Sequence, residues 1–278
     1  MVKVLIDSSS DFSLKECEER GLLMVSLSVS MNDKHFRDGR DITKDEFYEL
    51  LLKSSEFPKT AQPSPQDFLD HFSKVKEDGD ELVCVVLSSA LSGTYQSALI
   101  AKNMVDYDKI YVIDSLSATA GTRILIDVAL DMAKKGHSAK EIYEKLEKLK
   151  GKIRIFAGVG TLEYLAMGGR ISKAAATIGS LANIKPVIMV SDEGKVEVVA
   201  KCIGVSKAIK TLKDKLSDNP IDLSYPAYYV YTAGEENLDK LKESFKAIGI
   251  ENIKTQQIGP TIGAHVGPGA FGICYISK

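Results

Sequence analysis

Tryptophan is absent from this chain of 278 residues, and only 7% of the residues are aromatic. Proteins that bind single-stranded nucleic acid stack its bases on aromatic side chains, so this scarcity argues against such a platform. The formal net charge is −2 at pH 7, whereas domains that bind nucleic acid are normally basic. We therefore expect no nucleic-acid partner.

Long apolar runs are also missing. No stretch reaches the roughly 20 apolar residues that a membrane-spanning helix needs. The run Val2–Ile6, which ends at Asp7, has the pattern of a strand and not of a signal peptide. These features predict a cytoplasmic protein.

Cysteine is rare and scattered. The four cysteines, Cys17, Cys84, Cys202 and Cys274, form no C-x-x-C pair, and three of the four lie in or beside apolar runs. Isolated cysteines in such runs favour small buried side chains over a disulfide or a zinc site. We expect neither a metal nor a cofactor in this chain.

Short runs rich in β-branched residues alternate with longer helical patterns, which predicts an α/β fold with a largely parallel sheet. The expected strands are Val2–Ile6, Leu82–Leu87, Lys109–Ile113, Ile153–Phe156, Pro186–Val190, Val196–Ala200, Ala227–Tyr231 and Phe271–Ile276. The turn Ser191–Gly194 indicates a hairpin, so we expect a mixed sheet in the second half. The charged stretch Lys148–Lys152 marks the expected boundary between an N-terminal domain, 1–152, and a C-terminal domain, 153–278.

Helix starts are legible in the sequence. Thr43 and Ser138 each precede a Glu by three residues, which is the spacing of a capping box, and Ser64 precedes a proline. Two further helical segments, Ile124–Ala133 and Ala174–Ile184, are apolar on nearly every side. Such helices are either buried in the core or form the wall of an apolar ligand cavity.

The loop Asp7–Asp11 follows the first expected strand. Acidic residues at this place hold metal or phosphate in many α/β enzymes, but these two carboxylates are four positions apart instead of two. Serine and aspartate equally suit a turn that caps the next helix. A third reading places hydroxyls such as that of Ser9 at the mouth of a ligand cleft.

The loop Ser88–Thr94 also follows a strand and precedes a helix. Hydroxyls at Ser92 and Thr94, backbone N–H groups and the positive end of the helix dipole together suit an anion. Gly93 would let the ligand approach closely. The alternative is a capped helix without a ligand.

Three further residues are candidates for anion contacts. Thr60 lies in Lys59–Pro65, which we expect to be a stiff loop fixed by prolines. Arg170 follows a double glycine and offers a guanidinium fork for a carboxylate, although a lone Arg is more often a surface ion pair. His265 is the only titratable side chain in the segment Gly259–Gly272, whose many Gly and Pro residues predict a tightly packed loop.

In combination and in this order, these motifs resemble the DegV family of bacterial fatty-acid-binding proteins. The matching segments are Asp7–Asp11, Thr60 with Pro63–Pro65, Leu91–Ala98, Asp114–Ser115, Tyr164–Leu165 with Gly168–Ile171, and Gly263–Gly269. The resemblance runs from Val2 to the C-terminus. It implies two α/β domains with a long-chain fatty acid, such as palmitate or stearate, buried between them.

The resemblance also implies a function. Thr60, Ser92 and His265 would bind the carboxylate, with Arg170 as a supporting charge and with Gly93, Thr94 and Ser9 in supporting loops. The chain would be a carrier and not an enzyme: it would present the acid to a separate fatty acid kinase catalytic subunit, which makes the acyl phosphate. Transient contact with a membrane surface fits the same role.

Other functions stay open at this point. Ser92 with His265 as its base would make a serine hydrolase of acyl esters, although neither a nucleophile elbow nor a triad acid is recognisable. A binder of another hydrophobic acid, or a scaffold with an unoccupied cavity, would share the same composition.

Overall fold

The computed structural model describes residues 1–176 and 183–278. Its first half is built on a parallel sheet of four strands in the order β2-β1-β6-β7. The strands are β1 (Val2–Asp7), β2 (Leu22–Val25), β6 (Glu81–Val86) and β7 (Ile110–Asp114). Three of them were predicted, and β2 was missed because its four residues lie between polar segments.

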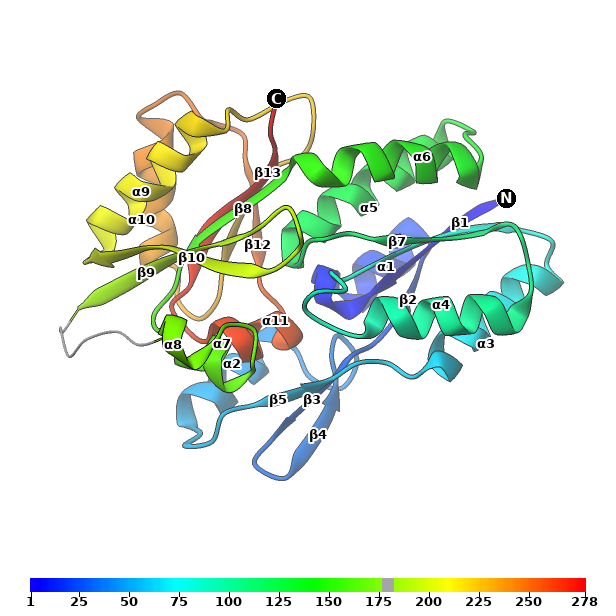
Figure 1. Ribbon diagram of the computed structural model, residues 1–278, viewed down its shortest axis with the longest axis horizontal. Coiled ribbons are helices and arrows are strands. Elements are labelled where there is room, and N and C mark those ends of the chain that lie inside the picture. Colours follow the sequence, from blue (N-terminus) through cyan, green and yellow to red (C-terminus); the bar gives the residue numbers. More distant parts are fainter. Residues whose placement is uncertain (177–182) are drawn as a thin grey trace.

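Helices cover both faces of this parallel sheet (Figure 1). One face packs on α3 (Pro65–Glu77) and α4 (Thr94–Val105), the other on α5 (Thr119–Lys134) and α6 (Ala139–Leu149). The short helices η1 (Ser8–Ser10), α1 (Leu14–Arg20) and η2 (Lys150–Lys152) complete this half. Burial on both faces explains why the predicted strands read as nearly continuous apolar runs.

The second half contains a mixed sheet of six strands in the order β10-β9-β8-β13-β11-β12, in which only β11 and β12 pair in parallel. Its strands are β8 (Ile153–Gly158), β9 (Ile184–Val190), β10 (Val196–Ile203), β11 (Tyr228–Tyr231), β12 (Lys254–Gln257) and β13 (Phe271–Ile276). Helices α9 (Val205–Asp218) and α10 (Glu236–Lys246) cover one face. The predicted mixed α/β class and the hairpin between β9 and β10 are confirmed.

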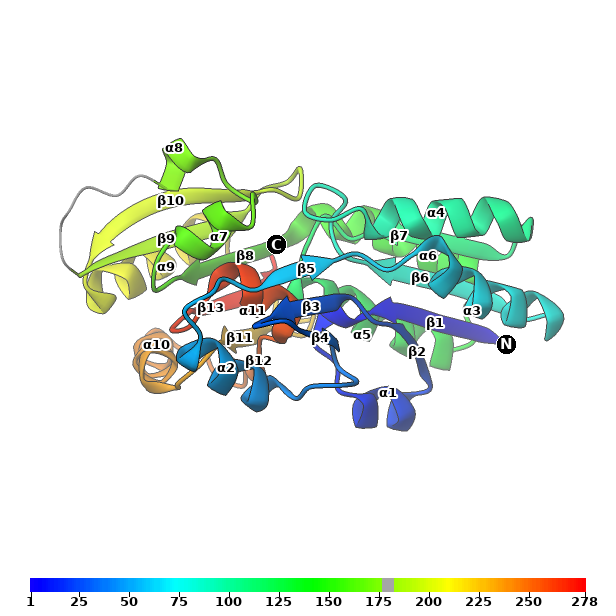
Figure 2. The same ribbon diagram turned by 90° about the horizontal axis from the view of Figure 1, so that it is seen from below.

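A third, antiparallel sheet was not predicted. It consists of β3 (Ser28–Met31), β4 (Lys34–Arg37) and β5 (Lys59–Ala61), and it is accompanied by α2 (Lys44–Lys53). The prediction of a loop at Thr60 was therefore wrong, because Thr60 pairs with Val29 as part of an edge strand. Figure 2 shows this small sheet beside α11 (Pro260–Val266), in the middle of the molecule.

Helix α11 is the second correction. The Gly- and Pro-rich segment Gly259–Gly272 was predicted as a loop, yet Pro260–Val266 form a helix with Pro260 at its first position. Proline is favoured there because its fixed φ suits the helix and its missing N–H is not needed. His265 therefore lies in the last turn of a helix, about one helical turn after Thr261.

The two apolar segments had different outcomes. Ile124–Ala133 lies inside α5, and its apolar side chains belong to the main hydrophobic core or pack against it, in agreement with the prediction of a buried helix. Within the predicted helix Ala174–Ile184, residues 174–176 belong to α8 (Lys173–Ala176), residues 177–182 lie outside the described part, and Ile184 opens β9. A helix reaching Ile184 is therefore wrong.

One hydrophobic core runs across the two halves. It contains Ile6 and Val85 of the parallel sheet, Ile124 of α5, and Ile155 and Val230 of the mixed sheet. The division into domains 1–152 and 153–278 stays a prediction. The four cysteines are buried and free, as expected for small core residues. None of the described helices combines the length and hydrophobicity that crossing a bilayer requires.

Candidate functional site

A cavity of about 350 Å³ lies where the two large sheets meet the small sheet and α11. Ligand cavities in proteins are typically about 300–1,000 Å³ and mostly apolar. Its apolar wall comes from both halves: Leu27, Ala61, Leu87, Leu91, Ala118, Ile155, Ala157, Leu165, Ile188, Val190, Val196, Val230, Ile258, Ile262 and Val266. The cavity is thus lined by residues that are distant in sequence.

Polar residues on the cavity wall include most of the predicted site. Thr60, Ser92, Gly93, Arg170 and His265 all line it, and the contacts below connect them. We call Thr60, Ser92, Arg170 and His265 the cavity-wall cluster. Their four side chains are half-buried, so each presents some surface to the cavity.

Thr60 and His265 form the centre of this cluster. The Oγ1 atom of Thr60 lies 2.8 Å from Nε2 of His265, which joins the edge strand β5 to the last turn of α11. The other ring nitrogen, Nδ1, is buried without a hydrogen-bond partner among the described residues. The ring packs so closely on Gly168 that a Cβ at that position would lie 2.1 Å from Nδ1. A side chain at position 168 would therefore displace the His265 ring.

His265 is neutral at pH 7. Burial, and then the positive charge of Arg170, lower the pKa of His265 to about 4. A neutral imidazole has one N–H donor and one acceptor nitrogen. When Nε2 carries the proton and donates to Thr60 Oγ1, the hydroxyl hydrogen of Thr60 is free to point into the cavity. The pair can then offer a donor to an anion without itself carrying charge.

Ser92 lies at the start of α4, one residue before Gly93. Its Oγ accepts from the backbone N–H of Thr94 at 3.3 Å and is 2.8 Å from Thr94 Oγ1. When Thr94 donates to Ser92, the Ser92 hydroxyl hydrogen is free for a ligand. Thr94 itself is fully buried and is not among the cavity-lining residues, so its role is to support Ser92.

Gly93 faces Gln62, a cavity-lining residue that the sequence did not single out. A Cβ at position 93 would lie 2.0 Å from Oε1 of Gln62, so no other residue fits without movement. The Gln62 amide donates to Ser97 Oγ at 3.1 Å and to the Gly93 carbonyl at 3.4 Å. The close neighbour of Gly93 in the structure is thus a side chain of this chain, and the close approach of a ligand stays a prediction.

Arg170 ties the loops around the cavity together. Its Nε and Nη2 donate to the carbonyl oxygen of Leu91 at 3.1 and 2.9 Å, and its Nη1 donates to that of Gly168 at 2.5 Å. Burial lowers the pKa of Arg170. Arg170 thus connects the Ser92 loop to the glycine that supports His265, and it brings a positive charge to the cavity wall.

Asp7 and Asp11 are anchors within the fold. Asp7 accepts from the backbone N–H groups of Ser9 and Leu87 and from the Ser9 hydroxyl. Asp11 accepts from the Thr119 hydroxyl and from the Gly259 N–H. Ser9 is fully buried and is not among the cavity-lining residues, so the prediction that placed its hydroxyl at the cleft mouth finds no counterpart here.

Besides Gln62, two further polar lining residues were missed. Thr119 opens α5 in a left-handed conformation with φ +48°, which is rare for a β-branched residue. Thr261 lies in the first turn of α11, four residues before His265 and on the same helical face. A helix predicted over Pro260–Val266 would have placed Thr261 on the same face as His265, but no sequence pattern indicated Thr119.

Comparison with known proteins extends over the whole chain. A family model described as "Uncharacterised protein, DegV family" matches residues 1–278. A DegV domain-containing protein of Caldanaerobacter subterraneus is 35% identical over 283 residues, which cover 100% of this chain and 99% of the relative.

Solved structures share the fold. A DegV family protein of Thermus thermophilus, whose structure is reported for fatty acid binding, is 30% identical with a TM-score of 0.89. A stearic acid-binding protein of Eubacterium ventriosum is 33% identical, also with a TM-score of 0.89. Each comparison covers 100% of this chain and 99% of the other.

Proposed function

The chain belongs to the DegV family, and from this premise we propose that it binds a long-chain fatty acid, such as palmitate or stearate, in the cavity. The observation that carries the proposal is an apolar cavity with the cavity-wall cluster of Thr60, Ser92, Arg170 and His265 on its wall. Burial of the acyl chain contributes roughly 0.8 kcal/mol per CH₂ group. The similar Thermus thermophilus and Eubacterium ventriosum structures, both reported with fatty acid binding, support it.

The head group needs specific partners, because an unpaired carboxylate is costly to bury. Hydroxyls of Thr60 and Ser92 would donate to it, with His265 orienting Thr60 and Arg170 supplying charge. Gly93 and Thr94 shape the Ser92 loop. We assign Ser9 only the structural contact with Asp7.

The finer role is that of a carrier without catalytic machinery of its own. We propose that the chain presents the bound acid to a separate fatty acid kinase catalytic subunit in the cytoplasm, with transient contact at a membrane surface. The sequence contains no P-loop pattern for a nucleotide, and the four cysteines are free thiols, as is usual in a reducing compartment. The hydrolase alternative lacks its central contact, since Ser92 pairs with Thr94 and His265 pairs with Thr60.

Native mass spectrometry of the purified protein, followed by titration of the delipidated protein, tests the proposal. We expect a mass increment that matches a C16–C18 acid, and uptake of stearate at one site. Methyl stearate, which keeps the tail but lacks the charge, should bind at least roughly tenfold more weakly, because hydrogen bonds to a charged group contribute more than neutral ones. A protein that neither carries nor takes up a long-chain acid would contradict the proposal.

A further inference from the structure

Helix α11 carries His265, and its start is held by carboxylates from the first half of the chain. Asp11 Oδ1 accepts from the Gly259 N–H at 2.8 Å, just before the helix. Asp38 Oδ2 accepts from the Thr261 N–H at 3.1 Å and from the Thr261 hydroxyl at 2.5 Å. The first N–H groups of a helix have no partner within the helix, so these contacts satisfy donors that would otherwise be unpaired.

The two carboxylates separate the apolar cavity from a second, polar cavity of about 560 Å³. Asp11 and Asp38 are each only 2% exposed, yet both line the polar cavity. Their hydrogen-bond partners Thr119 and Thr261 line the apolar one. Asp38 thus contacts the apolar cavity only through Thr261.

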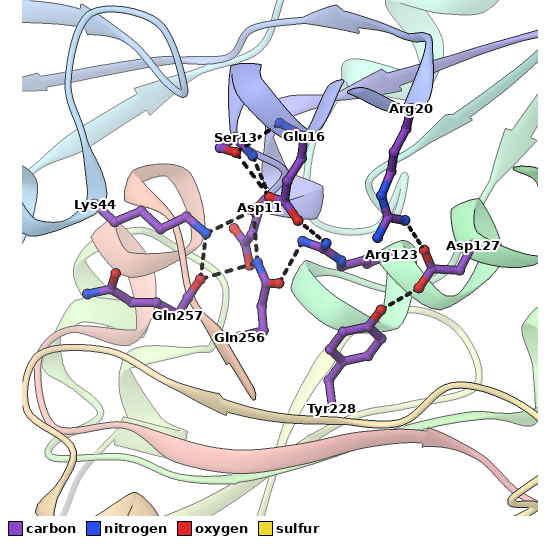
Figure 3. Close-up of polar contacts among 10 residues, drawn as sticks. All are labelled: Asp11, Ser13, Glu16, Arg20, Lys44, Arg123, Asp127, Tyr228, Gln256 and Gln257. Carbon is purple, nitrogen blue, oxygen red and sulfur yellow. Dashed lines mark hydrogen bonds and ion pairs between the residues drawn. The ribbon is translucent and has the colours of Figure 1, made fainter. Parts of the chain in front are cut away.

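The segment before α11 is equally restrained. Figure 3 shows Lys44 and Gln256 converging on Asp11: Lys44 Nζ donates to the carbonyl oxygens of Asp11 and Gln257 at 2.8 and 2.9 Å. Gln256 Nε2 donates to the same Asp11 carbonyl at 2.8 Å. These bonds leave the helix little freedom to move at its entry.

The middle of α11 is in close contact with α2. The Tyr48 hydroxyl donates to the Ile258 carbonyl at 2.9 Å, and a Cβ at Gly263 would lie 2.5 Å from that hydroxyl oxygen. Thr261 and His265 are one helical turn apart on one face. A displacement of Thr261 is therefore transmitted to the imidazole, and small displacements of binding groups are costly for ligand recognition.

We propose that Asp38 is a positioning residue for the fatty acid head group: by holding Thr261 in the first turn of α11, it fixes the His265 ring against Thr60. This inference rests on the proposed function for its ligand, but the position of the ring is measurable without one. It requires an acceptor oxygen at position 38 and not a negative charge.

The test compares Asp38→Ala, which removes the acceptor, with Asp38→Asn, which keeps one. Stearate affinity is measured by titration, and the His265 ring signals by NMR of the ligand-free protein. We expect Asp38→Ala to weaken binding roughly tenfold and to shift the ring signals, and Asp38→Asn to restore both. Wild-type affinity and unchanged ring signals in Asp38→Ala would overturn the inference, as would equal losses in both variants.

Asp127→Ala is the matched control. Asp127 pairs with Arg20 at 2.6 Å and with the Tyr228 hydroxyl, away from the cavity lining. It should lower the melting temperature while leaving stearate affinity and the His265 signals unchanged; a loss of affinity equal to that of Asp38→Ala would mean general loosening and would overturn the inference.

Thr261→Val replaces Asp38→Ala if that variant does not fold. It keeps the backbone donor and removes the hydroxyl donor, so we expect the same change in ring signals at smaller amplitude, and unchanged signals would overturn the inference. If the wild-type protein does not bind stearate, the proposed function fails, whereas the ring signals of the ligand-free variants still decide the role of Asp38.

Discussion

The two halves of the molecule meet at two junctions of opposite character. At the polar junction, α1 and α5 contact the edge of the mixed sheet through two sets of side chains, shown in Figure 3: Glu16, Arg123 and Gln256, and Arg20, Asp127 and Tyr228. At the apolar junction, side chains from the same two halves line the cavity with few polar atoms.

The difference lies in how each junction uses directional contacts. Arg123 is 5% exposed, donates to Glu16 and to Gln256, and stacks on the Phe12 ring at 3.9 Å. Such buried pairs fix geometry, and breaking one costs more than forming it contributes. At the apolar junction, directional contacts such as those of Thr60 with His265 and of Arg170 with Leu91 lie on the wall of the cavity. The polar junction thus joins the halves by paired side chains, whereas the apolar junction encloses a space that a ligand can fill.

The largest effect is expected at the polar junction. Arg123→Ala should reduce the free energy of unfolding by about 3 kcal/mol, because it leaves half-buried Glu16 without its partner. Chemical denaturation at pH 7 measures this loss. Arg123→Lys, which keeps the charge without the guanidinium fork, is the control and should recover only part of it. An unchanged unfolding midpoint in Arg123→Ala would contradict the structural role.

The polar junction also predicts how the stability of the protein changes at acid pH. Burial opposes ionisation of Glu16, but hydrogen bonds from Arg123 and Ser13 prevail and lower its pKa to about 2. Its contribution is therefore complete above pH 4.5 and is lost as the pH falls towards 2. In Arg123→Ala, the loss of stability between pH 4.5 and 2 that comes from Glu16 should be smaller.

Binding of stearate at the apolar junction should stabilise the folded protein against unfolding. At a free stearate concentration of 100 times Kd, the free energy of unfolding should rise by about 2.7 kcal/mol. Differential scanning calorimetry of delipidated protein with and without stearate measures the rise, and Asp127→Ala should show the same increment from a lower starting point. A stearate-bound protein that melts at the temperature of the delipidated one would contradict binding to the folded cavity.

His265 makes the apolar junction sensitive to acid. Because burial lowers its pKa to about 4, its contribution to stability is complete above pH 6.5 and is lost as the pH falls through 4. Relative to His265→Gln, the wild-type protein should lose about 2 kcal/mol between pH 6.5 and 4.5. Parallel stability curves for the two proteins would show that the ring is not buried in neutral form.

The titration of Asp38 should change the stability of the protein in the opposite direction, over an overlapping pH range. Burial raises its pKa to about 7, with a smaller contribution from the nearby Asp11 charge. The folded state therefore holds a proton that the unfolded state releases, and stability falls as the pH rises from about 4 to 7. Asp38→Asn, which cannot titrate, should flatten this fall in a series of denaturation curves.

The smallest effects concern single hydroxyls in the cavity-wall cluster. Thr60→Ala and Ser92→Ala should each weaken stearate binding roughly tenfold, because each removes one donor to a charged group. Thr60→Ser and Ser92→Thr keep the hydroxyl and serve as matched controls. Isothermal titration compares the four variants, and wild-type affinity in both alanine variants would remove these assignments.

Sequence patterns predicted the large elements of the fold better than the small ones. Strands such as Val2–Ile6 are buried on both faces, so their apolar runs are unambiguous. The three-residue strand β5 contains only Lys59, Thr60 and Ala61, and its pairing with β3 depends on distant residues. Helix α11 was not predicted because of its composition. Glycine allows the helix to pack closely against Tyr48, but it also lowers the helical propensity of the segment.

Local sequence motifs indicated several residues of the candidate site, and their role in ligand binding stays a prediction. Thr60, Ser92, Arg170 and His265 all line the cavity, but the sequence did not reveal that Arg170 binds carbonyl oxygens or that Thr60 and His265 are paired. Asp38 was not singled out, because its importance comes from a helix that starts more than 200 positions later. Contacts of this kind depend on tertiary structure.

The most direct test of the central claim follows the carboxyl carbon of bound stearate, labelled with 13C, by NMR. We expect one bound resonance that shifts in Thr60→Ala and His265→Gln and stays in place in Asp127→Ala. The absence of a bound resonance would contradict a fatty acid held by its carboxylate in this cavity. A bound resonance with the same chemical shift in Thr60→Ala and His265→Gln as in the wild-type protein would contradict it as well.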